Sequence, residues 1–238
     1  MTHLADIALT QEQIAIIKAY KHSIPGSPNS LRIPIRNARG INLGHLSPIT
    51  VSSAEDPDVI EALTRWRDRY KAFFQSQFKP TLAGTQSWLK NVVLKNDSRL
   101  LFLIYANSGV RVGNFGICHL TSTQAELDNL LRGEKGGDPD LIYHAEICMI
   151  HWIYETLCVG HIFLLIFENN ILTIMLHRSI GFKEIRSHPL YRVEKGEELN
   201  YTTIYEEGAT PIKRKMLEMA IDKKKYYEKH PWVQAQGF

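Results

Sequence analysis

The sequence predicts an α/β (α+β) fold in which a mixed, mostly antiparallel central sheet carries helices on both faces. Strand-like and helix-like segments follow one another in the order β–α–α–β–β–β–α–β–α–β–β. The segments 99–106 and 110–122 are joined by the turn Asn-Ser-Gly at 107–109, which is typical of an antiparallel hairpin. The continuous apolar run at 161–167 is expected of a strand that is buried on both faces.

Residues 1–46 are expected to form an N-terminal helix and a linker before the main domain. Thr10 has the residue type of an N-cap and Gln13 completes a capping box, so we expect a helix over 10–22. Residues 23–47 are rich in proline, glycine, serine and asparagine, and this composition predicts a long connection.

The main domain is expected to span 47–208, and its elements follow from the spacing of apolar residues and from turn residues. Asp138 and Pro139 suit an N-cap and a first helical position, and Gly181 suits the end of a helix. Strands are expected at 47–53, 99–106, 110–122, 124–131, 161–167, from 182 onward and at 201–207. Helices are expected at 58–73, 84–92, 138–157 and 170–180.

The C-terminal residues 209–238 are rich in lysine and are expected to form a basic amphipathic helix at 211–229 followed by a tail. Either the apolar residues of this helix dock on the domain, or its lysines contact acidic partners or a membrane surface.

The composition limits the class of function. A net charge of +3 over 238 residues is too small by itself to indicate a nucleic-acid partner. Three well-separated cysteines form no disulfide framework and favour a reducing compartment. The chain shows no secretory signal, and its most apolar stretch is too short to span a bilayer. We therefore expect a cytoplasmic protein without a membrane span. The sequence is compatible with a homodimer.

The segment Arg132-Gly133-Glu134-Lys135-Gly136-Gly137 lies between an expected strand and an expected helix. Glycines let the backbone approach a ligand, and successive N–H groups can form a concave anion site. The positive end of the next helix dipole and the charges of Arg132 and Lys135 add to the attraction. The segment therefore suits a pyrophosphate, although an exposed polar turn has the same composition. It matches neither the P-loop pattern nor the G-x-G-x-x-G pattern.

Residues 169–182, Asn-Asn-Ile-Leu-Thr-Ile-Met-Leu-His-Arg-Ser-Ile-Gly-Phe, resemble a motif of the GNAT superfamily of acyl-CoA-dependent N-acyltransferases. The family motif reads Asn-x-x-Ala-x-x-Leu-Tyr-x-x-x-Gly-Phe. Thr173 replaces the alanine, and His177 replaces the tyrosine. The matching positions are Asn170, Leu176, Gly181 and Phe182.

The resemblance covers about residues 48–208 and implies both a ligand and a site. It implies that the sheet splays between its fourth and fifth strands, where a backbone N–H near Leu130 or Leu131 meets the thioester oxygen of an acyl-CoA. It also implies that the segment from Arg132 to Gly137 holds the pyrophosphate of coenzyme A, although one extra residue makes this correspondence approximate. Acetyl-CoA or another acyl-CoA is the implied co-substrate, and Asn170 belongs to the implied cofactor site.

Acylation of an amine needs a base and an acid. An alkylamine has a pKa of about 10.4, so about one molecule in 10³ is a free amine at neutral pH. Glu126 and Asp128 share one face of a strand, so Glu126 is the first candidate base and Asp128 the second, although a solvated strand face looks the same. His119 is a further candidate. His177 either protonates the departing thiolate or merely packs in the place of the tyrosine.

Two competing chemistries are disfavoured. His144, Cys148 and His151 share a helix face, but no fourth ligand is identifiable, so we expect no metal site. No positioned base accompanies Cys148 or Cys158, so both are expected to be buried thiols rather than nucleophiles.

The sequence thus favours an N-acyltransferase that moves an acetyl or longer acyl group to a primary amine of a small molecule, an amino sugar nucleotide or a peptide. The alternative is a non-catalytic acyl-CoA-binding or scaffold domain on the same frame, because the usual tyrosine is missing. The region before the second strand of the domain suits a nucleotide sugar, an apolar acceptor or plain core packing. Its aromatic and cationic residues are Trp66, Arg67, Tyr70, Phe73 and Phe74.

Overall fold

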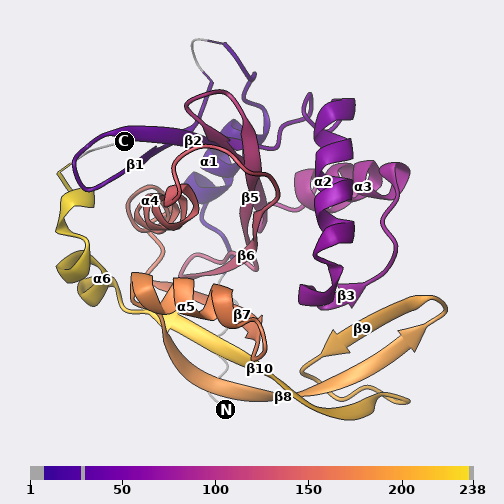
Figure 1. Cartoon of the computed structure of the whole chain (residues 1–238). Coiled ribbons are helices and arrows are strands. Elements are labelled where there is room, and N and C mark those ends of the chain that lie inside the picture. Colours follow the sequence, from indigo (N-terminus) through magenta and orange to yellow (C-terminus); the bar gives the residue numbers. More distant parts are fainter. Residues whose placement is uncertain (1–7, 28–29, 236–238) are drawn as a thin grey trace.

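Ten strands form one mixed sheet in the computed structural model, which describes residues 8–27 and 30–235 (Figure 1). The strand order is β1-β2-β4-β5-β6-β7-β10-β8-β9-β3, and only the β6–β7 pair is parallel among these strands. The strands are β1 (Ile33–Arg36), β2 (Asn42–Pro48), β3 (Ser76–Gln77), β4 (Leu100–Ala106), β5 (Arg111–Cys118), β6 (Gln124–Arg132), β7 (His161–Phe167), β8 (Lys183–Lys195), β9 (Glu198–Thr202) and β10 (Thr210–Ile221).

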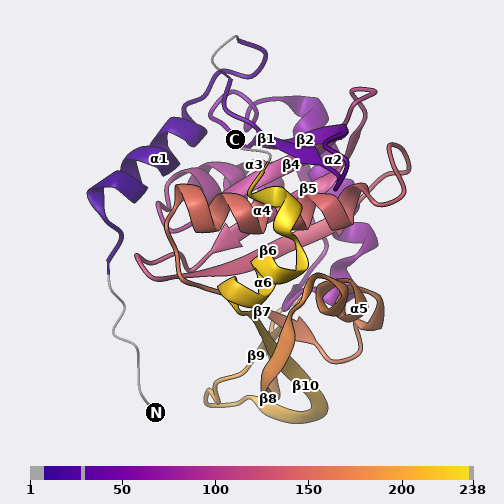
Figure 2. The same cartoon turned by 90° about the vertical axis from the view of Figure 1, so that its left-hand side faces the viewer.

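Helices cover both faces of this sheet, so the predicted fold class is confirmed (Figures 1 and 2). One core, around Phe102 and Trp152, joins the sheet to α1, α4, α5 and α6. A second core, around Trp66, joins the opposite face to α2 and α3. The helices are α1 (Gln11–Lys21), α2 (Pro57–Arg69), α3 (Leu82–Trp88), α4 (Leu141–Thr156), α5 (Ile171–Ile180) and α6 (Lys223–Lys229).

The expected linker at 23–47 is wrong in part, because it contains β1 and most of β2. Ile33 and Ile35 alternate with more exposed residues and are fully buried in the core below α4. Pro34, which cannot donate a ladder hydrogen bond, is accommodated because β1 is an edge strand. The strand expected at 47–53 ends at Pro48, and a turn held by the hydroxyl groups of Thr50 and Ser53 follows.

The basic helix expected at 211–229 is wrong over most of its length. Residues 210–221 form β10, which inserts between β7 and β8. Met216 and Met219 both suit one helix face, yet they lie on opposite faces of β10, because both faces of this strand are covered. Only α6 remains helical, and its Tyr226 docks on α4 by donating to the carbonyl oxygen of Ile147 at 2.7 Å.

Smaller differences concern the ends of elements. The strand expected at 201–207 is β9, which ends at Thr202. The helix expected to start at Asp138 starts at Leu141, and the Asp138 carboxylate accepts from the amide of Asp140 instead. No helix of residues 8–27 and 30–235 has both the length and the apolar character needed to cross a bilayer.

The strands β6 and β7 diverge, as the GNAT resemblance implies. They pair only from Gln124 to Glu126 on β6 and from His161 to Phe163 on β7. Beyond these residues β6 pairs only with β5, and β7 pairs only with β10. The sheet therefore opens as a V toward the carboxyl ends of both strands, and this opening is where the candidate site lies.

Candidate active site

A β-bulge interrupts β6 inside the V. Gly116 of β5 pairs with Asp128 of β6, and Asn114 of β5 pairs with Leu131 of β6. Between these two pairs β5 advances by two residues and β6 by three, so β6 contains one extra residue. Asn129 has a φ of 54°, a left-handed conformation that asparagine tolerates better than most residues. Asn129 and the next residue, Leu130, therefore have no paired residue on β5 or on β7. The bulge provides backbone groups at the place where the sequence predicts a thioester-binding amide.

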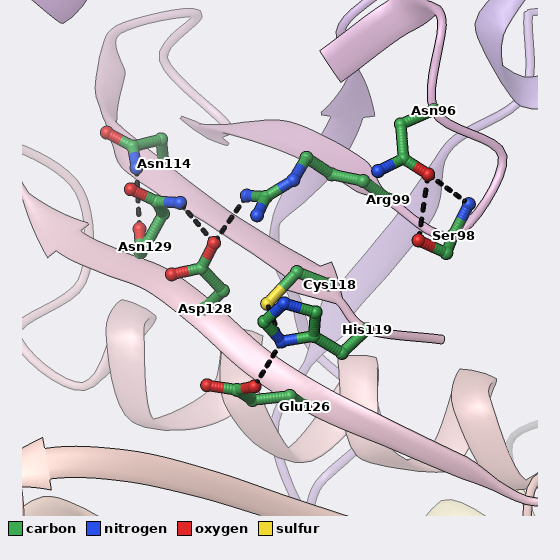
Figure 3. Close-up of polar contacts among 9 residues, drawn as sticks. All are labelled: Asn96, Ser98, Arg99, Asn114, Cys118, His119, Glu126, Asp128 and Asn129. Carbon is green, nitrogen blue, oxygen red and sulfur yellow. Dashed lines mark hydrogen bonds and ion pairs between the residues drawn. The ribbon is translucent and has the colours of Figure 1, made fainter. Parts of the chain in front are cut away.

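A chain of polar contacts holds the bulge (Figure 3). Nη1 of Arg99 lies 2.6 Å from Oδ2 of Asp128, and the side-chain amide of Asn129 donates to the same oxygen at 2.5 Å. The side-chain amide of Asn114 donates to the backbone oxygen of Asn129 at 2.5 Å. Asp128 is therefore committed to an arginine and an amide, and it is better placed to fix the bulge than to accept a proton.

Glu126 forms a pair with His119 on the same face of the sheet (Figure 3). Oε2 of Glu126 lies 2.6 Å from Nδ1 of His119, which has a φ of 46° just after β5. The Glu126 side chain is mostly buried, whereas the His119 side chain is 71% exposed. The hydrogen bond to Glu126 raises the pKa of His119, although burial opposes this shift. Two of the sequence candidates are thus joined by a hydrogen bond.

Cys118 lies beside this pair, with Sγ 3.6 Å from Nδ1 of His119. The possible ligand atoms of Cys118, His119 and Glu126 lie within 4.8 Å of one another, the one such group found in the described residues. Burial and then the charges of Asp128 and Glu126 raise the pKa of the Cys118 thiol, so it is neither a ready metal ligand nor a nucleophile.

The three α4 residues weighed as metal ligands in the sequence, His144, Cys148 and His151, have other contacts. His144 packs edge-to-face on Trp232, and His151 contacts the hydroxyl of Tyr227 at 3.1 Å. Cys148 is buried, and burial raises its pKa to about 11. Cys158, which was also expected to be buried, is exposed.

The first part of the loop after β6 is used for packing. The amides of Gly133 and Glu134 both donate to the carbonyl oxygen of Val112, at 2.8 and 2.9 Å. A Cβ on Gly133 would lie 2.2 Å from the ring of Trp66, so only glycine fits there. The Glu134 carboxylate accepts from Trp66 at 2.9 Å and pairs with Arg65 at 2.6 Å.

The second part of the loop is a glycine turn. Arg132 donates to the backbone oxygens of Gly136 and Pro139 and so closes the loop on itself. Gly136 and Gly137 have φ values of 137° and 69°. In the described part of the chain, the amides of Lys135, Gly136 and Gly137 donate no hydrogen bond. Three successive free amides next to a helix start are the donors that an anion needs.

The architecture is similar to that of solved acetyltransferases at low sequence identity. A probable GNAT-family acetyltransferase from Chromobacterium violaceum matches with a TM-score of 0.60, 11% identity and coverage of 96% of this chain and 94% of its own. FdhC, a nucleotide-linked sugar GNAT, matches with a TM-score of 0.58 and 11% identity, and the match covers 87% of this chain and 98% of FdhC. A spermidine N-acetyltransferase from Vibrio cholerae, solved with CoA and spermine, matches with a TM-score of 0.54 and 12% identity. This match covers 72% of this chain and 94% of the acetyltransferase. The chain has the GNAT fold.

Sequence comparison adds nothing to this, because no protein-family model matches the chain and no curated protein matches it. In this chain β6 and β7 are the diverging strands, and α5 begins directly after Asn170. The Asn170 side chain makes no capping hydrogen bond, and its backbone amide donates to Phe167.

His177, on α5 of the GNAT fold, is buried rather than exposed in the V. Its Nδ1 lies 2.6 Å from Oε1 of Glu146 on α4, and the two side chains are 5% and 0% exposed. The ring also packs edge-to-face on Phe182. Oε2 of Glu146 has no hydrogen-bond partner in the described residues. The contact holds Nδ1 of the ring and connects α5 to α4.

Sequence reasoning missed four residues of the site. Arg99, Asn114 and Asn129 hold the bulge, and their roles depend on strand register, which the sequence does not show. A signal existed for Glu146, because it is the single acidic residue within the apolar stretch from Leu141 to Tyr154. A buried acid in such a helix requires a partner.

Proposed function

We propose that the protein is an N-acyltransferase that moves an acetyl or longer acyl group from coenzyme A to a primary amine. The observation that carries this proposal is the bulge at Asn129 and Leu130 inside the β6–β7 opening, beside a turn with three free amides. The spermidine N-acetyltransferase from Vibrio cholerae, solved in complex with CoA and spermine, supports a CoA thioester and an amine as the two substrates.

The residues of the loop suit a pyrophosphate. The amides of Lys135, Gly136 and Gly137 would donate to phosphate oxygens, and the Lys135 ammonium would add charge. Arg132 shapes the loop through its bonds to Gly136 and Pro139. Leu130, Leu131 and Asn170 would line the pantetheine path in the V.

The reaction assigned to this site is direct attack by the amine. Of the two expected donors, Leu131 pairs with Asn114, so the backbone amide of Leu130 is assigned to polarise the thioester carbonyl. An unpaired donor aimed at a developing oxyanion stabilises the transition state. Nε2 of His119 accepts the proton of the amine, while Glu126 accepts from Nδ1 and holds the ring in the required tautomer. The amine nitrogen forms a bond to the carbonyl carbon, and the carbon–sulfur bond breaks.

His177 is assigned to the departing thiolate. Nδ1 of the ring lies 2.6 Å from Oε1 of Glu146, so Nε2 is the nitrogen that would deliver a proton to the sulfur as the carbon–sulfur bond breaks. The second candidate function is a non-catalytic acyl-CoA-binding domain. The burial of His177 favours it, because a buried ring can serve in packing alone.

One experiment separates the two candidates. Calorimetry with acetyl-CoA measures binding, and release of free thiol is then followed with a panel of amines that includes amino sugar nucleotides, polyamines and peptides. Binding together with amine-dependent thiol release supports the transferase. Binding without thiol release from any amine supports the binder, and absence of binding contradicts both.

A further inference from the structure

We propose that Arg214 binds an oxyanion, a carboxylate or a phosphate, carried by the amine acceptor; this inference rests on the proposed function and names a chemical class for its substrate. Arg214 lies in an irregular stretch of β10, where the register with β8 shifts between Ile212 and Met216. Met216 is the first β10 residue that pairs with β7, opposite Phe167. Arg214 therefore lies just beyond the open end of β7.

The Arg214 guanidinium is fixed by two aromatic rings. Its central carbon lies 3.9 Å from the ring centroid of Phe167 and 4.5 Å from that of Tyr201. The two rings meet edge-to-face, with centroids 5.5 Å apart. Stacking on aromatic faces orients a guanidinium without using its N–H groups, which stay available for another partner.

Two of those N–H groups have no acceptor. Nε and Nη2 of Arg214 are both buried and form no hydrogen bond within residues 8–27 and 30–235. Nε–H and Nη2–H point from the same edge of the guanidinium, which is the geometry that binds two oxygens of one carboxylate or phosphate. A buried cationic edge without an acceptor is costly, so a ligand oxyanion would remove an existing penalty.

The nearby acids are engaged elsewhere. Oε1 of Glu168 accepts from the backbone amide of Lys215 at 2.9 Å. Oε2 of Glu218 lies 2.7 Å from Nε2 of His188. No carboxylate of the described chain lies within ion-pair distance of Arg214. Within the described residues, these two donors therefore meet neither a carboxylate nor another hydrogen-bond acceptor.

Arg214 also lies on the face of the sheet that carries the proposed base. Glu126 pairs with Phe163, and Phe163 and Phe167 share a face because they are four residues apart on β7. Four strand residues span roughly 13 Å. A molecule with its amine at Glu126 and His119 and its oxyanion at Arg214 would follow β7 along this face. Such a molecule has its amine and its oxyanion at opposite ends.

A second stacked arginine connects the two places. The Arg67 guanidinium lies 3.6 Å from the ring centroid of Phe74 and donates to the backbone oxygen of Ser76 at 2.7 Å. Ser76 pairs with Asn200, the neighbour of Tyr201, which contacts Arg214. Burial lowers the pKa of Arg67 to about 10, so it remains a cation at neutral pH. Arg67 is therefore a second stacked cation next to the strand that carries Tyr201.

The test is calorimetric titration of oxyanions into the whole protein already saturated with coenzyme A, so that the loop after β6 is occupied. Pyrophosphate is the phosphate probe, and glutarate is the carboxylate probe. Wild type is compared with Arg214→Met and with Lys213→Met, which removes an exposed neighbouring charge. At least one probe should bind wild type and Lys213→Met alike, and Arg214→Met should weaken this binding at least tenfold. The probe that binds identifies the acceptor group.

Two outcomes would overturn the inference. The first is that neither probe binds the wild-type protein. The second is that Arg214→Met binds a probe as tightly as wild type does. Thermal unfolding without ligand guards against misfolding, because loss of an unpartnered guanidinium should leave the melting temperature unchanged or higher. A lower melting temperature with unchanged binding would make Arg214 a stacking residue only.

The failure of the proposed function looks different. It would appear as absence of coenzyme A binding, and the same titrations without coenzyme A would then still compare Arg214→Met with Lys213→Met. Arg214→Lys, which keeps the charge but lacks the two-donor edge, should bind the probe about tenfold more weakly than wild type.

Discussion

Nδ1 of His177 lies 2.6 Å from Oε1 of Glu146, and this contact joins α5 to α4 in the protein interior. The pair is buried, so its members depend on each other for stability. His177→Phe alone leaves the Glu146 carboxylate without its partner and should lower the free energy of unfolding by about 1–3 kcal/mol. The double variant with Glu146→Leu should recover much of this loss, as measured by urea denaturation. Additive losses would show that the two side chains are not coupled.

The same histidine gives a kinetic prediction. His177→Phe should lower kcat by about 10²-fold, because general acid catalysis typically contributes 10²–10⁴-fold. The KM for acyl-CoA should change much less. Met175→Ala, an exposed position on the same helix, is the control and should leave both constants near wild type. An unchanged kcat in well-folded His177→Phe would remove the acid role.

The His119–Glu126 pair predicts a pH dependence. The hydrogen bond raises the pKa of His119, and only the neutral ring accepts a proton, so kcat/KM should fall as the pH drops below that raised pKa. Glu126→Gln removes the stabilisation of the charged ring, which lowers the pKa of His119. The acidic limb should therefore move to lower pH, and the plateau rate should fall about tenfold because the ring loses its orientation. His119→Gln should abolish the limb, and a limb that survives in this variant would point to another base.

The bulge can be tested at Asn129, whose φ is 54°. Asn129→Gly keeps this conformation accessible, whereas a β-branched valine is strained there by about 1–3 kcal/mol. Asn129→Val should lower kcat about 10²-fold, comparable to the loss of one oxyanion donor, and Asn129→Gly should lower it less. The affinity for coenzyme A, measured by calorimetry, should change less than threefold in both. Equal rates in the two variants would contradict a role of the bulge conformation.

The free amides of the loop predict a binding defect. A Cβ on Gly137 would lie 2.8 Å from Cβ of Ala106, at a φ of 69°, so Gly137→Ala must shift the turn. Affinity for coenzyme A should fall at least tenfold by calorimetry. Gly160→Ala is the matched control, because its added Cβ meets nothing within 4 Å. Unchanged affinity in Gly137→Ala would place the pyrophosphate elsewhere.

Local patterns in the sequence predicted most of the elements. The capping box of Thr10 and Gln13 starts α1 as expected, and the hairpin turn before Val110 joins β4 to β5. Residues 161–167 form β7, and Gly181 ends α5. These features depend on contacts between residues a few positions apart, which the sequence displays directly.

Pairing between distant segments was not predictable in the same way. The residues of β10 have apolar spacing that suits a helix as well as a strand, and the gap between β7 and β8 decided in favour of the strand. The partners of Glu126 and His177 likewise come from other elements: His119 lies beyond the end of β5, and Glu146 lies on α4.

By itself, the sequence determined the class of fold, the order of most elements and the glycine-rich turn after β6. It also indicated Glu126 as one of two acids on a strand face and His177 as the residue in the place of the family tyrosine. The tertiary structure alone decided that the sheet opens after Glu126, that β6 bulges at Asn129 and that Arg214 is stacked with one edge unpartnered. The physical reason is that register, burial and hydrogen-bond partners arise from packing between segments far apart in the chain, whereas caps and turns arise from neighbours.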